Sequence, residues 1–287
     1  MATIRKPIFI VPVDLGSVTA ASARAGFPVT NINRFKSAGL TWKSGTVSGG
    51  QRWARGQFAS AQQIDFCAIV GANPQFTTMY RLRLGYSQTD VDGSEAPYDS
   101  GTIPFIPSFD EDVGSASLSM DFIGKQYLLE TPPSPFHSHL ELAVAQGCTW
   151  WRIDVTGQTV DFQCSALVLG KKVEPSHFYN LDFEYGVKDL GSLDFSRWGV
   201  WDEEDGKVLR TVSFTLGWQS EAEYEASFRP MIERLGKRGV VYVVFDPTVS
   251  PYRATRTYMG VFDKPPGAKG LRKPRTFSQD YEITSMI

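Results

Sequence analysis

The chain is poor in the two residue types that most often carry metal binding and nucleophilic catalysis. Its 287 residues include 3 cysteines and 3 histidines. Cys67, Cys148 and Cys164 are unevenly spaced and form no CxxC motif, which excludes a disulfide framework. Cys67 and Cys164 lie in apolar segments and are predicted to be small core residues. With so few histidines and no nucleophile elbow, no catalytic triad is indicated, so we predict neither an enzyme nor a bound cofactor.

Excess charge and long apolar segments are also missing. The formal net charge is −2, without the basic excess of a nucleic-acid-binding protein. No apolar segment approaches the ~20 residues that cross a bilayer, and the first residues lack the apolar core and cleavage site of a signal peptide. We therefore predict synthesis in the cytoplasm, no nucleic-acid partner and no membrane insertion. The one concentrated basic stretch, residues 264–275, is interleaved with proline and glycine and is expected to be an exposed loop.

Glycine, proline and aromatic residues are abundant, and short alternating segments dominate the first half. The chain has 26 glycines and 17 prolines, and aromatic residues make up 13% of it. Residues 79–86 alternate, with tyrosines and leucines on one face against Arg81 and Arg83 on the other. Residues 64–71 form a continuous apolar run that is typical of a buried strand. Further strands are expected at 7–13, 140–144, 150–155 and 160–169, and this pattern predicts a jelly-roll β-sandwich.

The second half contains a strand, a helix and a strand in close succession. Residues 212–218 alternate, and residues 240–245 form an apolar run. Ser220 and Glu223 have the spacing of a capping box at the start of a helix over 221–235. Pro230 removes one helix hydrogen bond, so a bend is expected near Ala226. The helix face predicted to be buried consists of Tyr224, Phe228, Met231 and Leu235.

A domain boundary is predicted at Glu174-Pro175, because proline there blocks both a helix and a sheet ladder and the sequence pattern changes afterwards. Residues 1–30 are then an N-terminal strand and arm, residues 31–174 a jelly-roll domain, and residues 175–287 a smaller α+β domain with one main helix. The predicted fold class is mainly β.

Tryptophans are the candidates for contacts with a glycan, since flat aromatic faces stack on sugar rings. Trp42, Trp53 and Trp150 are the residues concerned. The alternative is packing in the core or between subunits, in which one of the adjacent Trp150 and Trp151 faces the core.

Another pair of tryptophans suggests a contact between subunits. Trp198 and Trp201 lie in SRWGVWDEEDG, a segment that would ordinarily be a polar loop, and exposed aromatic residues often anchor interfaces. Together with Lys264, Arg272 and Arg275 they form the candidate subunit interface. The alternative for the two tryptophans is packing within the chain.

A weak calcium candidate consists of Asp90, Asp92 and Glu95 around Gly93. Calcium favours several carboxylate oxygens at a glycine turn, but the ligand series ends early. The alternative is an exposed hairpin turn at Asp92-Gly93. No other metal site is predicted.

Several longer segments resemble known phage proteins. QQIDFCAIVGANP (62–74), MYRLRLGYS (79–87), YDSG (98–101) and WWRIDVTG (150–157) are similar to galactose-binding-like jelly rolls appended to phage tail proteins. SRWGVWDEEDGKVLRTVSFTLGWQSEAEYE (196–225) and RLGKRGVVYVVFDP (234–247) resemble distal-tail or tail-tip baseplate proteins of long-tailed, siphovirus-like phages and gene transfer agents.

The resemblance implies a structural subunit in the virion, at the distal end of the tail. It implies a homo-oligomeric ring, with six-fold symmetry preferred and three-fold possible, that joins the tail tube and tail-tip hub proteins to the host-recognition apparatus. The alternative hypothesis is a carbohydrate-binding module that contacts a host surface glycan. A glycan-degrading enzyme is the least supported hypothesis, although paired carboxylates cannot be located from sequence.

Overall fold

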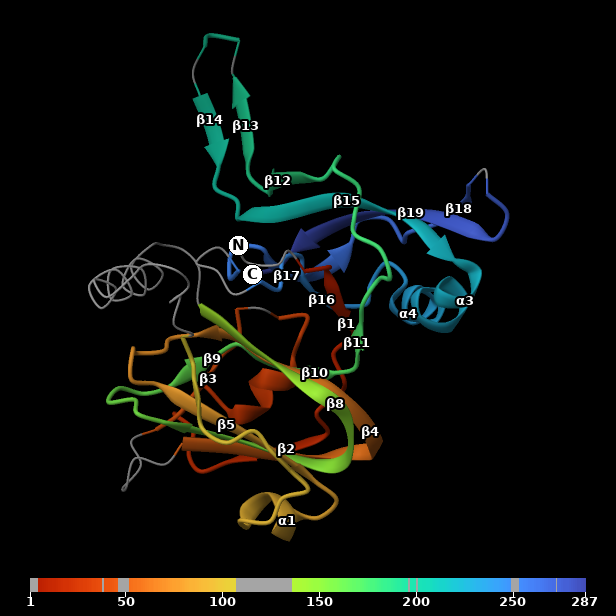
Figure 1. The fold of residues 1–287 in the computed structure, drawn as a ribbon. Helices are drawn as coiled ribbons and strands as arrows, with labels where there is room; N and C mark the ends of the chain where they lie inside the picture. The colour runs from red at the N-terminus through yellow and green to blue at the C-terminus, as the bar shows by residue number, and fades with distance from the viewer. Residues whose placement is uncertain are drawn as a thin grey trace, which may run out of the picture. The chain divides into compact units, whose positions relative to one another are not determined.

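The computed structural model describes residues 5–37, 39–45, 52–106, 136–195, 197–199, 201–248, 253–271 and 273–287. They divide into two compact units (Figure 1). Unit 1 is built mainly from residues 10–172, and unit 2 from residues 173–247 and 256–287 together with residues 5–9. The N-terminal strand, expected to belong to a separate arm, is therefore part of unit 2.

Unit 1 is built on a seven-stranded antiparallel sheet. Its strand order is β10 (Ala166–Gly170), β4 (Arg52–Ala72), β8 (Phe136–Thr156), β5 (Met79–Gly85) and β6 (Tyr98–Asp99), with β2 (Ser17–Ala20) paired to β4 and β7 (Ile103–Pro104) to β5. The remaining elements are a 3-10 helix (Val29–Asn33), the short helix α1 (Gln88–Asp92) and a two-stranded sheet of β3 (Trp42–Lys43) and β9 (Gln163–Cys164).

Two long strands hold unit 1 together. β4 and β8 are each 21 residues long and pair with three shifts of register along their length. Such irregularities bend a strand, and the two strands curve around the core (Figure 1). The predicted strand 64–71 is part of β4, and the predicted strands 140–144 and 150–155 are both part of β8. The predicted strand 160–169 is divided into β9 and β10. Phe58, Ile64, Cys67, Trp151, Phe162 and Leu169 are among the buried core residues.

Unit 2 combines a second sheet with one helical segment. The eight strands of the sheet include β1 (Ile8–Ile10), β11 (Lys172–Val173), β12 (Glu184–Asp189), β15 (Val208–Ser220), β16 (Val241–Val244), β17 (Thr257–Phe262), β18 (Ala268–Gly270) and β19 (Thr276–Ser285). Their order is β11-β1-β16-β17-β19-β15-β12, with β18 on β19. A separate hairpin consists of β13 (Ser192–Phe195) and β14 (Trp201–Glu204). The chain is therefore mainly β, with a sandwich-like first unit and an α+β second unit, which confirms the predicted fold class.

The helical segment covers the predicted residues but changes its hydrogen-bond pattern midway. It runs through α3 (Glu221–Glu223), a π-helical turn (Tyr224–Phe228) and α4 (Arg229–Leu235). The N–H of Arg229 donates to the carbonyl of Tyr224, five residues earlier. Pro230 has no N–H to donate, so one hydrogen bond of a regular α-helix is missing directly after this turn. A π turn changes the hydrogen-bond pattern of a helix locally. This turn is the local irregularity that the proline was expected to cause.

The cap of this helix differs from the prediction in one respect. The Ser220 hydroxyl accepts from the Glu223 N–H at 3.2 Å, as a capping box requires. The Glu223 carboxylate, however, accepts from the Ser176 N–H at 2.7 Å and from the Ser176 hydroxyl at 2.5 Å. The Glu223 carboxylate thus links the helix start to Ser176, instead of accepting from the Ser220 N–H as the second bond of a capping box.

The alternation in β15 is broken by a bulge. Val212, Phe214 and Leu216 are buried as predicted, but the register with β19 shifts between Leu216 and Gln219. Trp218 occupies the bulge in a left-handed conformation with φ 61° and is exposed, while Gln219 takes the buried position. The expectation that Trp218 lies on the buried face is therefore wrong, because one extra residue at a bulge exchanges the two faces of a strand.

We expect Phe228→Ala to lower the free energy of unfolding by ~3–5 kcal/mol, since the ring is fully buried and the surrounding aromatic side chains cannot close the cavity. Phe9 contacts it edge-on at 6.0 Å between ring centroids. Urea denaturation provides the measurement, with the exposed Lys237→Ala as the control, expected to stay within about 0.5 kcal/mol of the native chain. A loss below ~1 kcal/mol for Phe228→Ala would contradict the packing described here.

Candidate functional site

Three neighbouring strands of unit 1 present charged side chains on one face. In the register of β4, β8 and β5, Arg55 is opposite Arg152, which is opposite Arg83. The residues one position away on each strand are opposite one another in the same way and are buried in the core: Ala54, Ile153 and Leu82. Because side chains alternate along a strand, burying the apolar row forces the arginines onto the opposite face.

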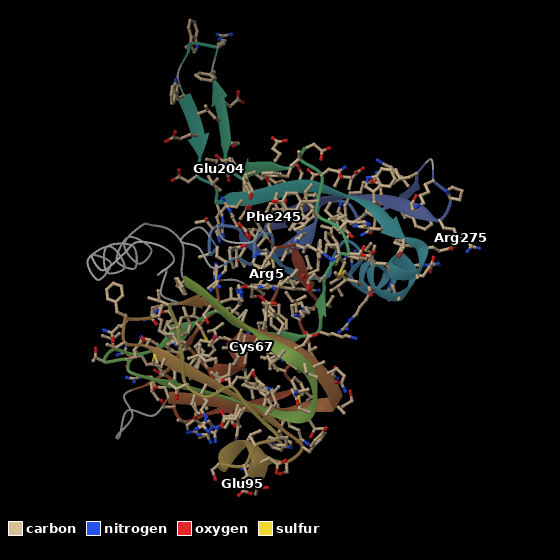
Figure 2. The ribbon with its side chains drawn as sticks, in the orientation of Figure 1. Arg5, Cys67, Glu95, Glu204, Phe245 and Arg275 are labelled. Carbon is tan, nitrogen blue, oxygen red and sulfur yellow. The ribbon has the colours of Figure 1, made fainter. Side chains whose placement is uncertain are left out.

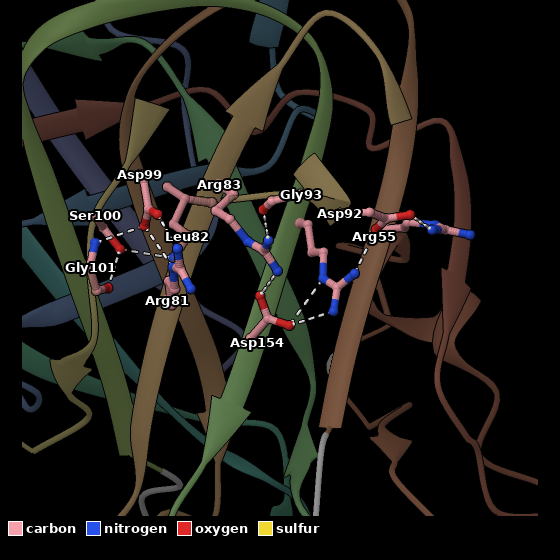
Figure 3. Close-up of polar contacts among 11 residues, drawn as sticks. Arg55, Arg81, Leu82, Arg83, Asp92, Gly93, Asp99, Ser100, Gly101 and Asp154 are labelled. Atoms are coloured by element: carbon pink, nitrogen blue, oxygen red, sulfur yellow. Dashed lines mark hydrogen bonds and ion pairs between the residues drawn. The ribbon is translucent and has the colours of Figure 1, made fainter. Parts of the chain in front are cut away.

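Aspartates separate these arginines into a ladder of ion pairs (Figure 3). Asp92, at the end of α1, pairs with Arg55 and accepts from Arg152 Nη1 at 2.5 Å. Asp154 accepts from Arg152 Nη2 at 2.8 Å and from Arg83 Nη2 at 2.6 Å. Alternation of charge lets each carboxylate offset two guanidinium groups, which limits the repulsion between adjacent arginines.

Arg83 is the most enclosed member of the ladder. Its side chain is nearly buried, and its Nη1 donates to the carbonyl of Gly93 at 2.6 Å. Gly93 caps the C-terminal end of α1. The arginine therefore joins α1 to the sheet, and the ladder depends on the placement of this short helix.

A further pair, Arg81 with Asp99, extends the charged face toward β6. Arg81 Nε donates to Asp99 Oδ1 at 2.7 Å, and a second bond makes the contact bidentate. The hydrogen bond from Arg81 lowers the pKa of Asp99. For Asp92, burial works against ionisation, but the hydrogen bond from Arg152 and the charges of Arg55 and Arg152 prevail and lower its pKa. Both carboxyls are therefore held in the ionised form.

A cleft of about 330 Å³ opens beside the ladder. Arginine guanidinium groups, carboxylates and hydroxyl-bearing residues surround it, so it offers several hydrogen-bond donors and acceptors within a small volume. The lining includes Arg81, Arg83, Asp92, Thr102, Arg152 and Asp154.

The three candidate tryptophans for a glycan have different surroundings. Trp42 is only 2% exposed and donates its indole N–H to the carbonyl of Ser22, so its ring lies in the core and is not available to a sugar. The ring of Trp53 is covered by the guanidinium groups of Arg55 and Arg152, at 5.0 and 4.8 Å from its centroid. Trp150 is half-buried on the charged face, and its neighbour Trp151 is fully buried.

The calcium candidate is not assembled. Asp90 serves α1, since its carboxylate accepts from the N–H groups of Tyr86 and Ser87 at 2.9 and 3.0 Å. Asp92 is engaged by arginines, and Glu95 is exposed. Over the described part of the chain, no cluster of three potential metal ligands is present. The expected hairpin turn is also wrong, because Ser87 and Asp90 form a capping box that starts a helix.

One buried acid lies elsewhere in unit 1. Asp65 is 7% exposed, and burial raises its pKa. Its carboxylate accepts from the N–H of Lys172 at 2.6 Å, which ties the end of unit 1 to β4. Asp65 does not line the cleft, and its carboxylate makes a structural contact with the backbone of Lys172.

The candidate interface residues of unit 2 are exposed. Trp198 is 78% exposed and Trp201 is 65% exposed, and both lie on the hairpin of β13 and β14. Most of each side chain is therefore not packed against the described residues of the chain. Lys264 and Arg275 are also exposed, at the loops that flank β18, and Arg272 lies outside the described residues. In this part of unit 2 further apolar side chains are exposed: Leu181, Val187, Leu190, Leu193, Phe195 and Val208.

Sequence reasoning found the tryptophans but missed the arginine ladder. A signal was present in part, since Arg81 and Arg83 were recognised as the polar face of a strand. Arg55 and Arg152 belong to other segments, and only the register of β4, β8 and β5 brings all four arginines together. Asp92 was considered with the wrong partners, because the fold of α1 was not recognised.

No helix in the described part of the chain has the length and apolar character to cross a membrane. The chain matches no protein-family model, and no curated protein matches it significantly.

Solved structures show a distant likeness. The chain is similar over 57% of its length to the family 32 carbohydrate-binding module of NanJ from C. perfringens, in complex with galactose, with 10% identity, 99% of that chain covered and a TM-score of 0.37. It is similar over 56% to chitosan-binding module 1 from the chitosanase/glucanase of Paenibacillus sp. IK-5, with 12% identity, 97% covered and a TM-score of 0.34. Reduced XRCC1 bound to the DNA pol beta catalytic domain matches over 56%, with 12% identity, 99% covered and a TM-score of 0.37. At these scores the likeness decides neither the ligand nor the activity of this chain.

The ion pairs predict a loss of stability in acid. Because the pKa values of Asp92 and Asp99 are lowered in the folded state, their stabilisation is present above the ordinary aspartate pKa of about 3.9 and is lost as pH falls through the folded-state pKa. The free energy of unfolding, measured by urea denaturation between about pH 7 and pH 3, should therefore fall below about pH 4.

The double variant Asp92→Asn with Asp99→Asn tests the origin of this effect. It should be less stable than the native chain at neutral pH and should lose less stability on acidification. An equal acid-induced loss in the variant and the native chain would show that these two carboxyls do not contribute.

Proposed function

We propose that unit 1 is a non-catalytic module that binds a saccharide in the cleft beside the arginine ladder. The observation that carries this proposal is the convergence of guanidinium, carboxylate and hydroxyl groups on one cleft of about 330 Å³. Sugar hydroxyls both donate and accept hydrogen bonds, so a cleft that holds fixed donors beside fixed acceptors suits them. Because Trp53 is covered by guanidinium groups, polar contacts would dominate over ring stacking.

The charge state of the cleft favours binding over hydrolysis. Glycoside hydrolysis needs one carboxylic acid whose pKa is raised so that it can protonate the leaving group. Asp92 has the opposite shift, since arginines lower its pKa, and Asp154 accepts from two arginines. The proposed module therefore holds its ligand without a general acid.

A matched pair of threonine variants tests the saccharide proposal. Thr102→Val removes a hydroxyl at the cleft without touching the ion pairs, and Thr30→Val removes an exposed hydroxyl on the 3-10 helix. On a glycan array followed by titration calorimetry, the native chain and Thr30→Val should bind the same saccharide equally, and Thr102→Val about fivefold or more weakly. Equal binding by all three chains, or no saccharide bound by the native chain, would refute the proposal.

A second function is supported by the exposed apolar side chains of unit 2. Large exposed apolar side chains that gather on one part of a protein often mark an interface. Taken with the resemblance to tail-tip proteins, this observation supports the proposal that the chain is a structural subunit at the distal end of a phage tail, in contact with the tail tube and hub proteins. Unit 2 would form the ring, and unit 1 would meet the host glycan.

Electron cryomicroscopy of purified virions tests this second function. We expect the subunit at the distal end of the tail, in a closed ring of six copies, with three as the other arrangement compatible with the resemblance. Its absence from purified virions would refute a structural role in the tail, whatever the result of the glycan experiment.

A further inference from the structure

The hairpin of β13 and β14 has the character of a binding element. In the described residues its two strands pair only with each other, and a two-stranded ribbon is marginally stable in water without further packing. Phe195 is opposite Trp201 and Leu193 is opposite Glu203, so three apolar side chains share one face. All three are more than half exposed. The face needs a partner to cover it.

The hairpin and the loop region around β18 carry opposite charge. Residues 189–205 contain six acidic residues and one arginine, a net charge of −5, and residues 264–275 contain five basic residues and no acid, a net charge of +5. Within the described residues of unit 2, Asp194, Glu203 and Asp205 form no ion pair with a lysine or arginine. On the basic side Lys269 pairs with Asp280 and Arg275 with Glu221. Lys264 and Lys273, in contrast, form no ion pair within the described residues. The two surfaces therefore still differ in the sign of their unpaired charge.

Within one molecule the β18 end of the basic surface lies far from the hairpin, while the start of residues 264–275 lies closer, since Asp263 is 3.9 Å from Lys188 Nζ. The hairpin enters β15 at Val208, and β18 pairs with β19 beside the other end of β15, where Ser220 is opposite Thr276. The eleven residues from Val208 to Trp218 span roughly 33 Å of strand, because ten steps of about 3.3 Å separate the first from the last. Glu204 and Arg275 accordingly lie at opposite ends of unit 2 (Figure 2).

The basic end also offers an apolar contact. Trp218 is 59% exposed and is held outward by the bulge in a left-handed conformation. A non-glycine residue in this conformation is strained, and such strain concentrates at functional positions. Lys269 is opposite Ser278 on the neighbouring β19, and Arg275 has the same unusual backbone conformation as Trp218. An exposed aromatic side chain on the end of the sheet that also carries basic residues complements a hairpin with aromatic and acidic side chains.

We infer that the acidic hairpin of one copy docks on the basic end of unit 2 of a second copy. This inference rests on the assembly role proposed above. It adds which two surfaces of neighbouring copies meet. Because two different surfaces meet, each copy can bind one neighbour at either end, and repetition produces a ring or a filament. A symmetric contact between two hairpins is disfavoured, since it would bring like charges together.

Charge reversal on the full-length chain tests this contact. The first variant carries Glu203→Lys and Asp205→Lys, which reduces the net charge of residues 189–205 from −5 to −1, since each substitution changes it by two. The second carries Lys264→Glu and Lys273→Glu, which reduces the net charge of residues 264–275 from +5 to +1 in the same way. In sedimentation velocity at low salt, each variant alone should associate at least about tenfold more weakly than the native chain, and an equimolar mixture should recover association. Only a contact between hairpin and basic end predicts recovery in the mixture.

The control reverses an exposed basic pair outside both surfaces, Lys237→Glu with Arg238→Glu, and should associate as the native chain does. A native chain that stays monomeric up to about 1 mM overturns the inference, as does a mixture that fails to associate. Loss of association in Trp198→Ala with Trp201→Ala, combined with insensitivity to both charge reversals, would also overturn it while leaving an assembly role for the hairpin intact.

Discussion

Strand register is the constraint on which the features of both units depend. In unit 1, the pairing of β4 with β8 and of β8 with β5 decides that Ala54, Ile153 and Leu82 enter the core while the arginines beside them face outward. A slip of one residue would exchange these two faces and bury four guanidinium groups. In unit 2 the register between β15 and β19 shifts at a bulge near Trp218. The shift exposes the Trp218 side chain to solvent.

The arginine ladder shows how a charged sheet face is kept stable. Each of Asp92 and Asp154 contacts two arginines, so charges of opposite sign alternate across three strands and α1. Partly buried charges cost free energy unless each has a partner with good geometry, and the ladder meets this condition. The same arrangement holds the guanidinium groups in fixed orientations, which is what a binding cleft for a polar ligand requires. Stability and proposed binding thus rest on one set of contacts.

Unit 2 distributes its apolar residues in a different way. Its interior contains a closely packed aromatic cluster, in which Phe214 and Tyr281 stack at 5.3 Å and Phe245 lies 5.1 Å from Phe214. Its hairpin, in contrast, leaves Phe195, Trp198 and Trp201 exposed. The interior is covered by its own side chains, whereas these hairpin side chains are exposed among the described residues. A rigid sheet that carries an incompletely packed hairpin is well suited to assembly, because docking adds contacts without refolding the interior.

Local patterns in the sequence were sufficient for the elements whose side chains are either all buried or strictly alternating. The strand of residues 79–85, the helical segment from Glu221 to Leu235 and the apolar strand Val241–Val244 follow from periodicity alone, because burial of one face imposes that periodicity. The sequence also determined the charge segregation between residues 189–205 and 264–275. Tertiary structure decided which strands are neighbours. It therefore decided that Arg55, Arg83 and Arg152 form one ladder, that Trp42 is buried, and that the hairpin and β18 lie at opposite ends of β15. Those outcomes depend on pairing between residues up to about a hundred positions apart, and no local periodicity records such pairing.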